Sequence, residues 1–74
     1  MNKERRARLS DVVSSLRQCV DDINDIDSDE EESRENLPEN MHDGDRYQES
    51  EEYSDKMNEA VSLIEEAIDA IEEI

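Results

Sequence analysis

Phenylalanine and tryptophan are absent from this chain of 74 residues, and glycine, proline, cysteine and histidine occur once each. The single cysteine, Cys19, excludes an intrachain disulfide, and a reducing compartment suits it best. There is no run of about 18 apolar residues that could cross a membrane, and no short apolar stretch behind a basic start that would form a signal peptide. We therefore expect a cytoplasmic protein that does not act on a membrane.

A catalytic or metal-binding set of residues is also missing. No Ser/His/Asp or Cys/His group lies within reach along the sequence, so nucleophilic and acid–base chemistry have no starting point. Asp25, Asp27 and Asp29 have the spacing of the first ligands in an EF-hand loop, but Glu30 and Asn36 stand where that loop needs glycine and a bidentate glutamate. The lone histidine, in a polar turn, is expected to be solvated. We predict that the chain is not an enzyme and binds neither cofactor nor metal.

Negative charge is what the chain has in excess. It contains 24 acidic and 8 basic residues, which gives a net charge of −16. Residues 1–26 are neutral overall, with five acids and five bases, whereas residues 27–56 hold thirteen acids and three bases and residues 57–74 hold six acids and no base. Runs of this kind are most often solvated faces or flexible segments. The apolar pattern around them argues against disorder.

Apolar residues recur at alternating steps of three and four in both halves of the chain, which is typical of a helical seam. In the first half the predicted seam is Leu9, Val12, Leu16, Cys19, Ile23 and Ile26. Val13 and Val20 widen this stripe, as in a helix of a bundle. Cys19 is expected to be a small buried residue. In the second half the predicted seam is Met57, Val61, Ile64, Ile68 and Ile71.

Pro38 separates the two predicted helices, because proline disfavours helix in the residue before it. Asp43 or Asp45 could cap the second helix, and Asp45 with Gln48 has the form of a capping box. We predict a single domain, residues 1–74, with a first helix over about 4–36, a corner over about 37–45 and a second helix over about 46–74. The predicted fold class is all-α, an antiparallel, coiled-coil-like hairpin of two helices.

The hairpin would place the basic cluster, Lys3, Arg5, Arg6 and Arg8, beside the acids near the end of the second helix. The alternative is a basic arm that binds nucleic acid, which the net charge of the chain disfavours. Since a chain of this length buries only about 60% of its unfolded surface, we also expect two hairpins to form a homodimeric four-helix bundle. The predicted oligomer core is Leu9, Val12, Val13, Leu16, Val20, Ile23, Val61, Ile64, Ile68 and Ile71.

The stretch ENLPEN, residues 35–40, followed by YSDKMNEAVSLIEEAIDAIEEI, residues 53–74, resembles a group of small acidic helical proteins from bacteria and their phages. In that group an Asn-Leu-Pro-Glu corner precedes an amphipathic helix rich in Glu, Ala and Ile. The likeness spans Asn36 to Ile74, although NMHDGDRYQ, residues 40–48, departs from the pattern. The resemblance implies a two-helix hairpin and a phage or prophage setting, and hence the host cytoplasm. It implies no particular activity.

Two functions follow from this pattern. The first is an acidic interaction protein, such as a phage counter-defence inhibitor that binds a basic nucleic-acid-handling protein as a mimic of DNA and does not itself bind nucleic acid. A hairpin about 45 Å long would carry one net charge per ~2.8 Å, against ~1.7 Å in duplex DNA. The alternative is a structural or adaptor module that docks a partner helix through its apolar stripe. The acids predicted to bind the partner are Asp27, Asp29, Glu30, Glu31, Glu32, Glu35, Glu49, Glu51, Glu52 and Asp55.

Overall fold

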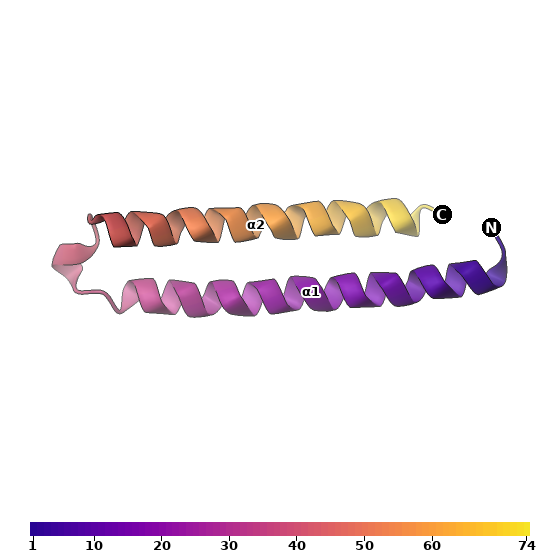
Figure 1. Cartoon of the computed structure of the whole chain (residues 1–74), viewed down its shortest axis with the longest axis horizontal. Coiled ribbons are helices and arrows are strands. Elements are labelled where there is room, and N and C mark those ends of the chain that lie inside the picture. Colours follow the sequence, from indigo (N-terminus) through magenta and orange to yellow (C-terminus); the bar gives the residue numbers. More distant parts are fainter.

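The computed structural model describes all 74 residues and consists of two long antiparallel helices (Figure 1). Helix α1 is Lys3–Glu35 and helix α2 is Asp45–Glu72, while a single turn of 3-10 helix, η1, occupies Glu39–Met41 in the corner. The molecule is a rod of 59 × 15 × 11 Å, measured on its Cα atoms, with both termini at the end opposite the corner. The prediction of an all-helical hairpin is confirmed.

Helix α1 is continuous through its acidic last third. It begins at Lys3 because the side chain of Asn2 accepts the backbone N–H of Arg5 at 2.9 Å, which caps one of the free donors of the first turn. No proline or glycine interrupts residues 3–35. Arg34 lies in the last turn, where a positive charge favours the helix dipole. The helix ends before Pro38, as its backbone restriction requires.

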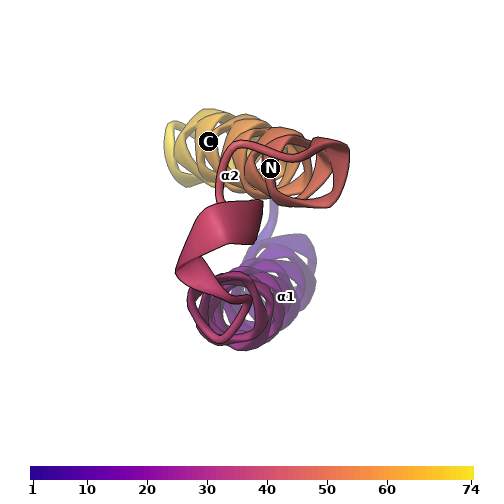
Figure 2. The same ribbon diagram turned by 90° about the vertical axis from the view of Figure 1, so that its left-hand side faces the viewer.

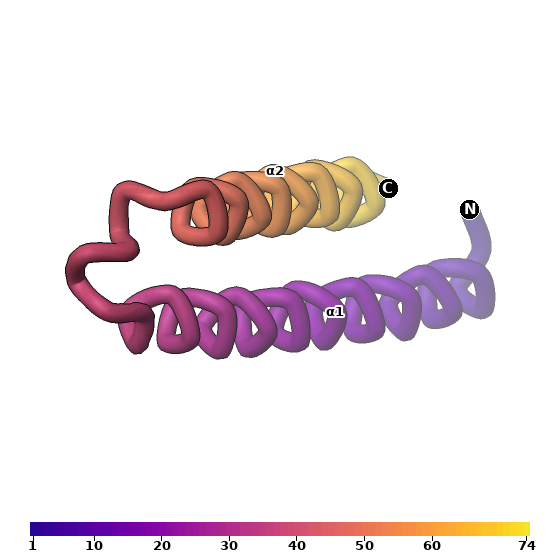
Figure 3. Tube along the Cα trace, turned by 60° about the vertical axis from the view of Figure 1, so that its left-hand side comes forward, coloured from indigo at the N-terminus to yellow at the C-terminus, as the bar shows by residue number.

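The corner is a compact run of turns between the two helices (Figures 2 and 3). The N–H of Met41 donates to the carbonyl of Pro38 at 2.8 Å, and the N–H of Gly44 donates to the carbonyl of Met41 at 3.1 Å. The predicted capping box is wrong. Gly44, in extended conformation, is the N-cap residue of α2 and has no side chain to donate or accept, while Asp45 is already helical. The Asp45 carboxylate therefore contributes only its charge to the helix N-terminus.

The seam between the helices uses only part of the predicted stripe. Val12 and Ile26 are 46% and 58% exposed, and Cys19 is exposed as well, so their predicted place in the hairpin seam is wrong. Both flanks of the stripe repeat every seven residues, so the period alone does not predict which flank faces α2. The half-buried or buried apolar seam is Leu9, Val13, Leu16, Val20 and Ile23 on α1 with Met57, Val61, Ile64, Ile68 and Ile71 on α2.

Only the half of the seam near the termini is apolar. Ile68, 3% exposed, is the one apolar side chain that the hairpin buries. Towards the corner the same heptad positions hold Asp27, Glu30 and Arg34 on α1 and Tyr47, Ser50 and Ser54 on α2. Ser50 and Ser54 are buried. The guanidinium of Arg34 donates to their hydroxyls at 3.1 and 3.0 Å, so hydrogen bonds take the place of apolar packing in this half.

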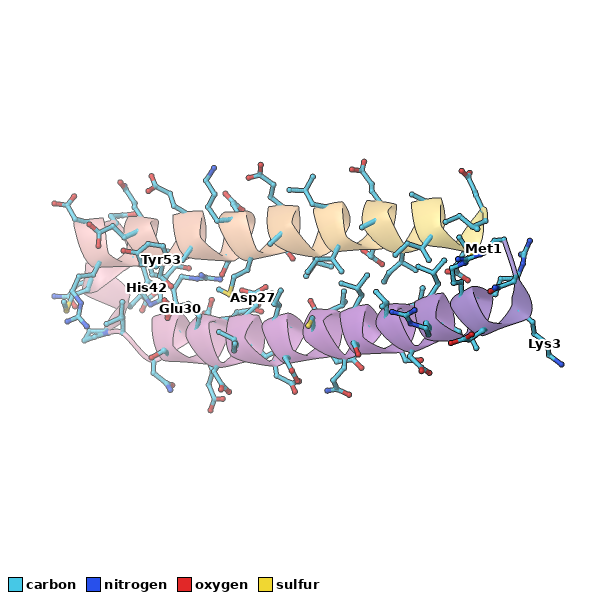
Figure 4. The ribbon with its side chains drawn as sticks, turned by 45° about the vertical axis from the view of Figure 1, so that its right-hand side comes forward. Met1, Lys3, Asp27, Glu30, His42 and Tyr53 are labelled. Atoms are coloured by element: carbon cyan, nitrogen blue, oxygen red, sulfur yellow. The ribbon has the colours of Figure 1, made fainter.

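The basic cluster does not form the predicted ion pairs with the end of α2. The interhelical ion pair is made instead by Arg17, whose guanidinium lies 2.7 Å from the carboxylate of Glu72. Arg6 donates to the backbone carbonyl of Ile74 at 2.6 Å. Lys3 lies at the open end of the hairpin (Figure 4), and neither it nor Arg5 nor Arg8 makes an ion pair. The cluster is thus largely free of acidic partners within the hairpin.

We expect sodium chloride to raise the melting temperature of the hairpin. The chain has 24 acids but only two ion pairs, Arg17–Glu72 and Lys56–Glu59, so like-charge repulsion between the helices is little compensated. Screening over a Debye length of ~10 Å at 0.1 M salt reduces that repulsion. Thermal unfolding followed by circular dichroism should show a midpoint that rises by several degrees from low to moderate salt. A midpoint that stays constant or falls would mean that the charges are compensated in the fold.

Candidate partner-binding site

The ten predicted acids gather at the corner end of the rod, because the last turns of α1 lie against the first turns of α2. Arg34 on one helix and Ser50 and Ser54 on the other fix this alignment. We call the set the acidic tip; it comprises Asp27, Asp29, Glu30, Glu31, Glu32, Glu35, Glu49, Glu51, Glu52 and Asp55. Eight of them are exposed, whereas Asp27 and Glu30 are half-buried on the seam. Figure 4 shows the latter two between the helices.

One side of the acidic tip is a groove lined by four carboxylates. Asp27 and Glu31 come from α1, and Glu51 and Asp55 come from α2. We call this feature the acidic groove. Its remaining lining consists of Arg34, Ser54 and Asn58, with no apolar side chain. The Oδ1 atom of Asp27 is buried and accepts no hydrogen bond. A buried acceptor without a donor costs about 1–3 kcal/mol, so this carboxylate reduces the stability of the hairpin.

The positive charge of Arg34 does not neutralise the acidic groove by direct ion pairing. One of its guanidinium nitrogens is bonded to the two seam serines, and its guanidinium carbon lies 5.8 Å from the centre of the Tyr47 ring. No carboxylate oxygen lies within ion-pair distance of it. Arg34 therefore acts mainly to close the tip, and the exposed carboxylates of Glu31, Glu51 and Asp55 make no ion pair.

His42 stabilises the same end of the molecule and is not the solvated side chain that the sequence predicted. Its ring is half-buried and stacks on Tyr47 with centroids 4.7 Å apart. Its Nε2 atom lies 2.9 Å from the carbonyl oxygen of Leu37. Sequence reasoning missed the structural role of Arg34, His42 and Tyr47. The available signal was the seven-residue period, which continues through Arg34 and Leu37 on one side and Tyr47 on the other.

The opposite side of the tip is less strongly negative. A second groove there is lined by Glu30 and Glu49 together with Arg34, Arg46 and the exposed side chain of Tyr53. Lys56 lies farther along the same side, where it lines a groove with Tyr53 and bonds Glu59 at 3.3 Å. Arg46 and Lys56 thus lie on this side, and Arg34 lines both grooves. The acidic groove is the side of the tip with the larger excess of acids.

The carboxylates of the tip are not arranged as a metal site. No group of three or more His, Cys, Asp or Glu side chains converges so that it could hold a metal ion. Asp25, Asp27 and Asp29 lie inside continuous α1, where side chains two positions apart point in different directions.

Comparison with known proteins identifies no relative: no family model, no curated protein and no solved structure matches this chain. Neither helix is long and apolar enough to cross a membrane. Both helices have charged residues on nearly every turn, and their apolar residues are confined to narrow stripes. The surface chemistry of the hairpin is therefore the basis for inferring its function.

Proposed function

We propose that this protein is a non-enzymatic interaction protein that binds a basic, nucleic-acid-handling protein through the acidic tip, as a phage counter-defence inhibitor would. The main support is the unpartnered, buried Oδ1 of Asp27 in a groove whose other carboxylates are Glu31, Glu51 and Asp55. An arginine side chain of the partner would supply positive charge and hydrogen-bond donors to the three exposed carboxylates. Such a partner normally holds nucleic acid with the same arginines, so the hairpin would compete with it.

The charge density of the rod is lower than the sequence suggested. Its length is 59 Å, against the expected ~45 Å, because the corner and the termini extend it beyond the paired helices. Sixteen net charges over that length give one per about 3.7 Å. Two hairpins side by side would give one per about 1.8 Å, close to the ~1.7 Å of duplex DNA. Mimicry of DNA by charge density thus favours a dimer.

We include the homodimeric four-helix bundle in this proposal. The hairpin buries one apolar side chain, Ile68, and leaves the rest of its apolar seam half-buried. A small domain with so little buried apolar surface gains stability from a second copy. The proposed setting is the cytoplasm, where Cys19 remains reduced and basic nucleic-acid-handling proteins are found.

The adaptor alternative is less well supported by the geometry. Ile64 and Ile68, at the centre of the stripe of α2, pack in the seam against α1, and Ile68 is 3% exposed. A partner helix could dock on them only if the hairpin opened. Eight of the ten acids of the tip are exposed without any rearrangement, so binding through them is favoured.

The proposal is tested by capture of partners from a bacterial lysate on immobilised full-length protein. We expect a basic protein that is released by added duplex DNA, and we expect its loss when the ten acids of the tip are changed to Asn and Gln. The matched comparison is Ile64→Ala, which weakens the seam and leaves every charge in place. If capture survives loss of the acids and is abolished by Ile64→Ala in a chain that stays helical, the adaptor function replaces the acidic one.

A further inference from the structure

The two long flanks of the hairpin differ in chemistry. On one flank, the heptad rows beside the seam hold Val12, Cys19 and Ile26 of α1 with Tyr53, Ala60 and Ala67 of α2. We call these six residues the apolar flank. Ile26 and Tyr53 line one groove, which places the two rows on the same side of the molecule. On the other flank the equivalent rows are polar, and they comprise Ser10, Arg17, Asn24 and Glu31 with Glu51, Asn58, Glu65 and Glu72.

The apolar flank adjoins the half-buried seam residues of α1. We call Leu9, Leu16 and Ile23 the middle row of α1. It lies between the row of Val13 and Val20, which faces α2, and the row of Val12, Cys19 and Ile26. In a four-helix bundle, residues at this middle position point to the centre and are covered by two neighbouring helices. The hairpin supplies one of these neighbours. A second helix on the apolar flank would bury Val12 and Ile26 and complete the burial of the middle row.

The charges on this flank indicate how a second copy is oriented. At one end of α1, Val12 lines a groove with Arg5, Arg8 and Asp11, whereas at the other end Ile26 lines a groove with Asp29, Glu30 and Lys56. The first groove has one more base than acids, and the second has one more acid than bases. Two copies in opposite directions would therefore bring unlike charges together at both ends of the contact between the two α1 helices.

The spacing of these residues matches that arrangement. Cys19 is the central residue of the 33-residue helix α1. Val12 and Ile26 are each seven residues from it, and Arg8 and Glu30 are each eleven residues from it. A two-fold axis at Cys19 would place Val12 of one copy on Ile26 of the other and Arg8 on Glu30. Helix α1 is thus complementary to itself in the antiparallel direction.

We infer that two hairpins pair through the apolar flank in antiparallel orientation, with α1 against α1, α2 against α2 and the two Cys19 side chains beside the two-fold axis. The open end of each hairpin then lies beside the tip of the other. A parallel pair would place α1 against α2 of the second copy and would bring the two acidic tips together, which like-charge repulsion opposes. This inference deepens the homodimer of the proposed function. The acidic groove, on the other flank, stays exposed.

Disulfide trapping tests the orientation, because a disulfide forms only between Cα atoms within about 7 Å. Mild oxidation of the full-length protein at micromolar concentration is expected to give a Cys19–Cys19 dimer as the main product on a non-reducing gel. Two double variants test the pairing of Val12 with Ile26. One carries Cys19→Ser and Val12→Cys, and the other carries Cys19→Ser and Ile26→Cys. Their mixture is expected to give a covalent heterodimer. Neither of these two variants should cross-link efficiently alone. Cys19→Ser with Asn24→Cys, which puts the thiol on the polar flank, is the matched control and should remain monomeric on the gel.

Two outcomes would overturn the inference. One is equally fast cross-linking of the Asn24→Cys control, which would show random collision. The other is a disulfide between Cys19 of the wild-type chain and the new cysteine of a second chain that carries Ala67→Cys and Cys19→Ser. That product would show that α1 faces α2 of the second copy in a parallel pair.

A non-covalent measurement checks the same surface. Val12→Glu with Ile26→Glu, at exposed positions of the hairpin, should halve the mass seen by sedimentation while helicity is kept. Ser10→Glu with Asn24→Glu adds the same charge to the polar flank and should leave the mass unchanged. Wild-type protein that sediments as a monomer would refute the dimer. Binding of a basic partner by such a monomer would still stand, so the proposed function and the orientation of the dimer can fail separately.

Discussion

Ile68→Ala is expected to unfold most of the hairpin. Ile68 is the only apolar side chain that the fold buries, at 3% exposure, and it lies in the apolar half of the seam. Removing a buried isoleucine side chain to alanine typically costs about 2–5 kcal/mol. That loss is comparable to the whole stability that a single core supplies in a domain of this size, about 3–5 kcal/mol. Far-ultraviolet circular dichroism at room temperature should show loss of most of the helical signal.

Leu63→Ala is the matched control for that variant. Leu63 lies one turn and a half before Ile68 on the same helix, but it is 58% exposed. Substitutions at such surface positions usually change the free energy of unfolding by no more than about 0.5 kcal/mol. Equal destabilisation by the two variants would show that burial in the seam is not what holds the hairpin together.

Asp27→Leu is expected to have the opposite effect and to raise the melting temperature by about 5–15 °C. Asp27 occupies a seam position, is half-buried, and has a buried oxygen that accepts no hydrogen bond. Leucine would remove the unpaired acceptor, worth about 1–3 kcal/mol, and one of thirteen acids in residues 27–56. It would also extend the apolar packing of Ile23 by one step along the seam. Thermal unfolding by circular dichroism measures the change.

Asp29→Leu removes the same charge two residues along, at an exposed position, and serves as the control. It should raise the midpoint only by the small amount that loss of one surface charge allows. We further expect the stabilised Asp27→Leu protein to bind its partner more weakly, because a residue that serves binding often does so at the expense of stability. A variant that gained no stability would show that the carboxylate of Asp27 is adequately solvated in the hairpin.

Much of the fold is evident in the sequence because local signals agree. Pro38 ends the first helix, the absence of proline and glycine from residues 3–35 lets it run through the acids, and the three-and-four spacing requires two amphipathic helices. The sequence did not allow a prediction of which flank of the α1 stripe packs against α2. Leu9, Leu16 and Ile23 belong equally to a seam with Val12 and Cys19 or to one with Val13 and Val20, and only the handedness of the packed pair decides between them.

The candidate site was predictable in composition and not in arrangement. The ten acids do gather at the tip, because the hairpin brings residues 27–35 and 49–55 together. Some of these acids line the acidic groove, and others lie on the opposite side of the tip together with bases. This division depends on which flank of the hairpin each heptad row occupies. The polar half of the seam, with Arg34 bonded to Ser50 and Ser54, was hidden because serine and arginine do not stand out in an apolar period.

We propose that the acidic groove, more than the overall charge, binds the partner. The direct test is titration of the captured partner with two variants that each lose four charges. In the first, Asp27 and Asp55 become Asn while Glu31 and Glu51 become Gln; in the second, Asp29 becomes Asn while Glu32, Glu49 and Glu52 become Gln. We predict that the first variant binds about a hundredfold more weakly than wild type, as loss of buried charge pairs implies, and that the second loses less than about tenfold. Equal losses would show that diffuse charge alone binds the partner and that the acidic groove has no special role.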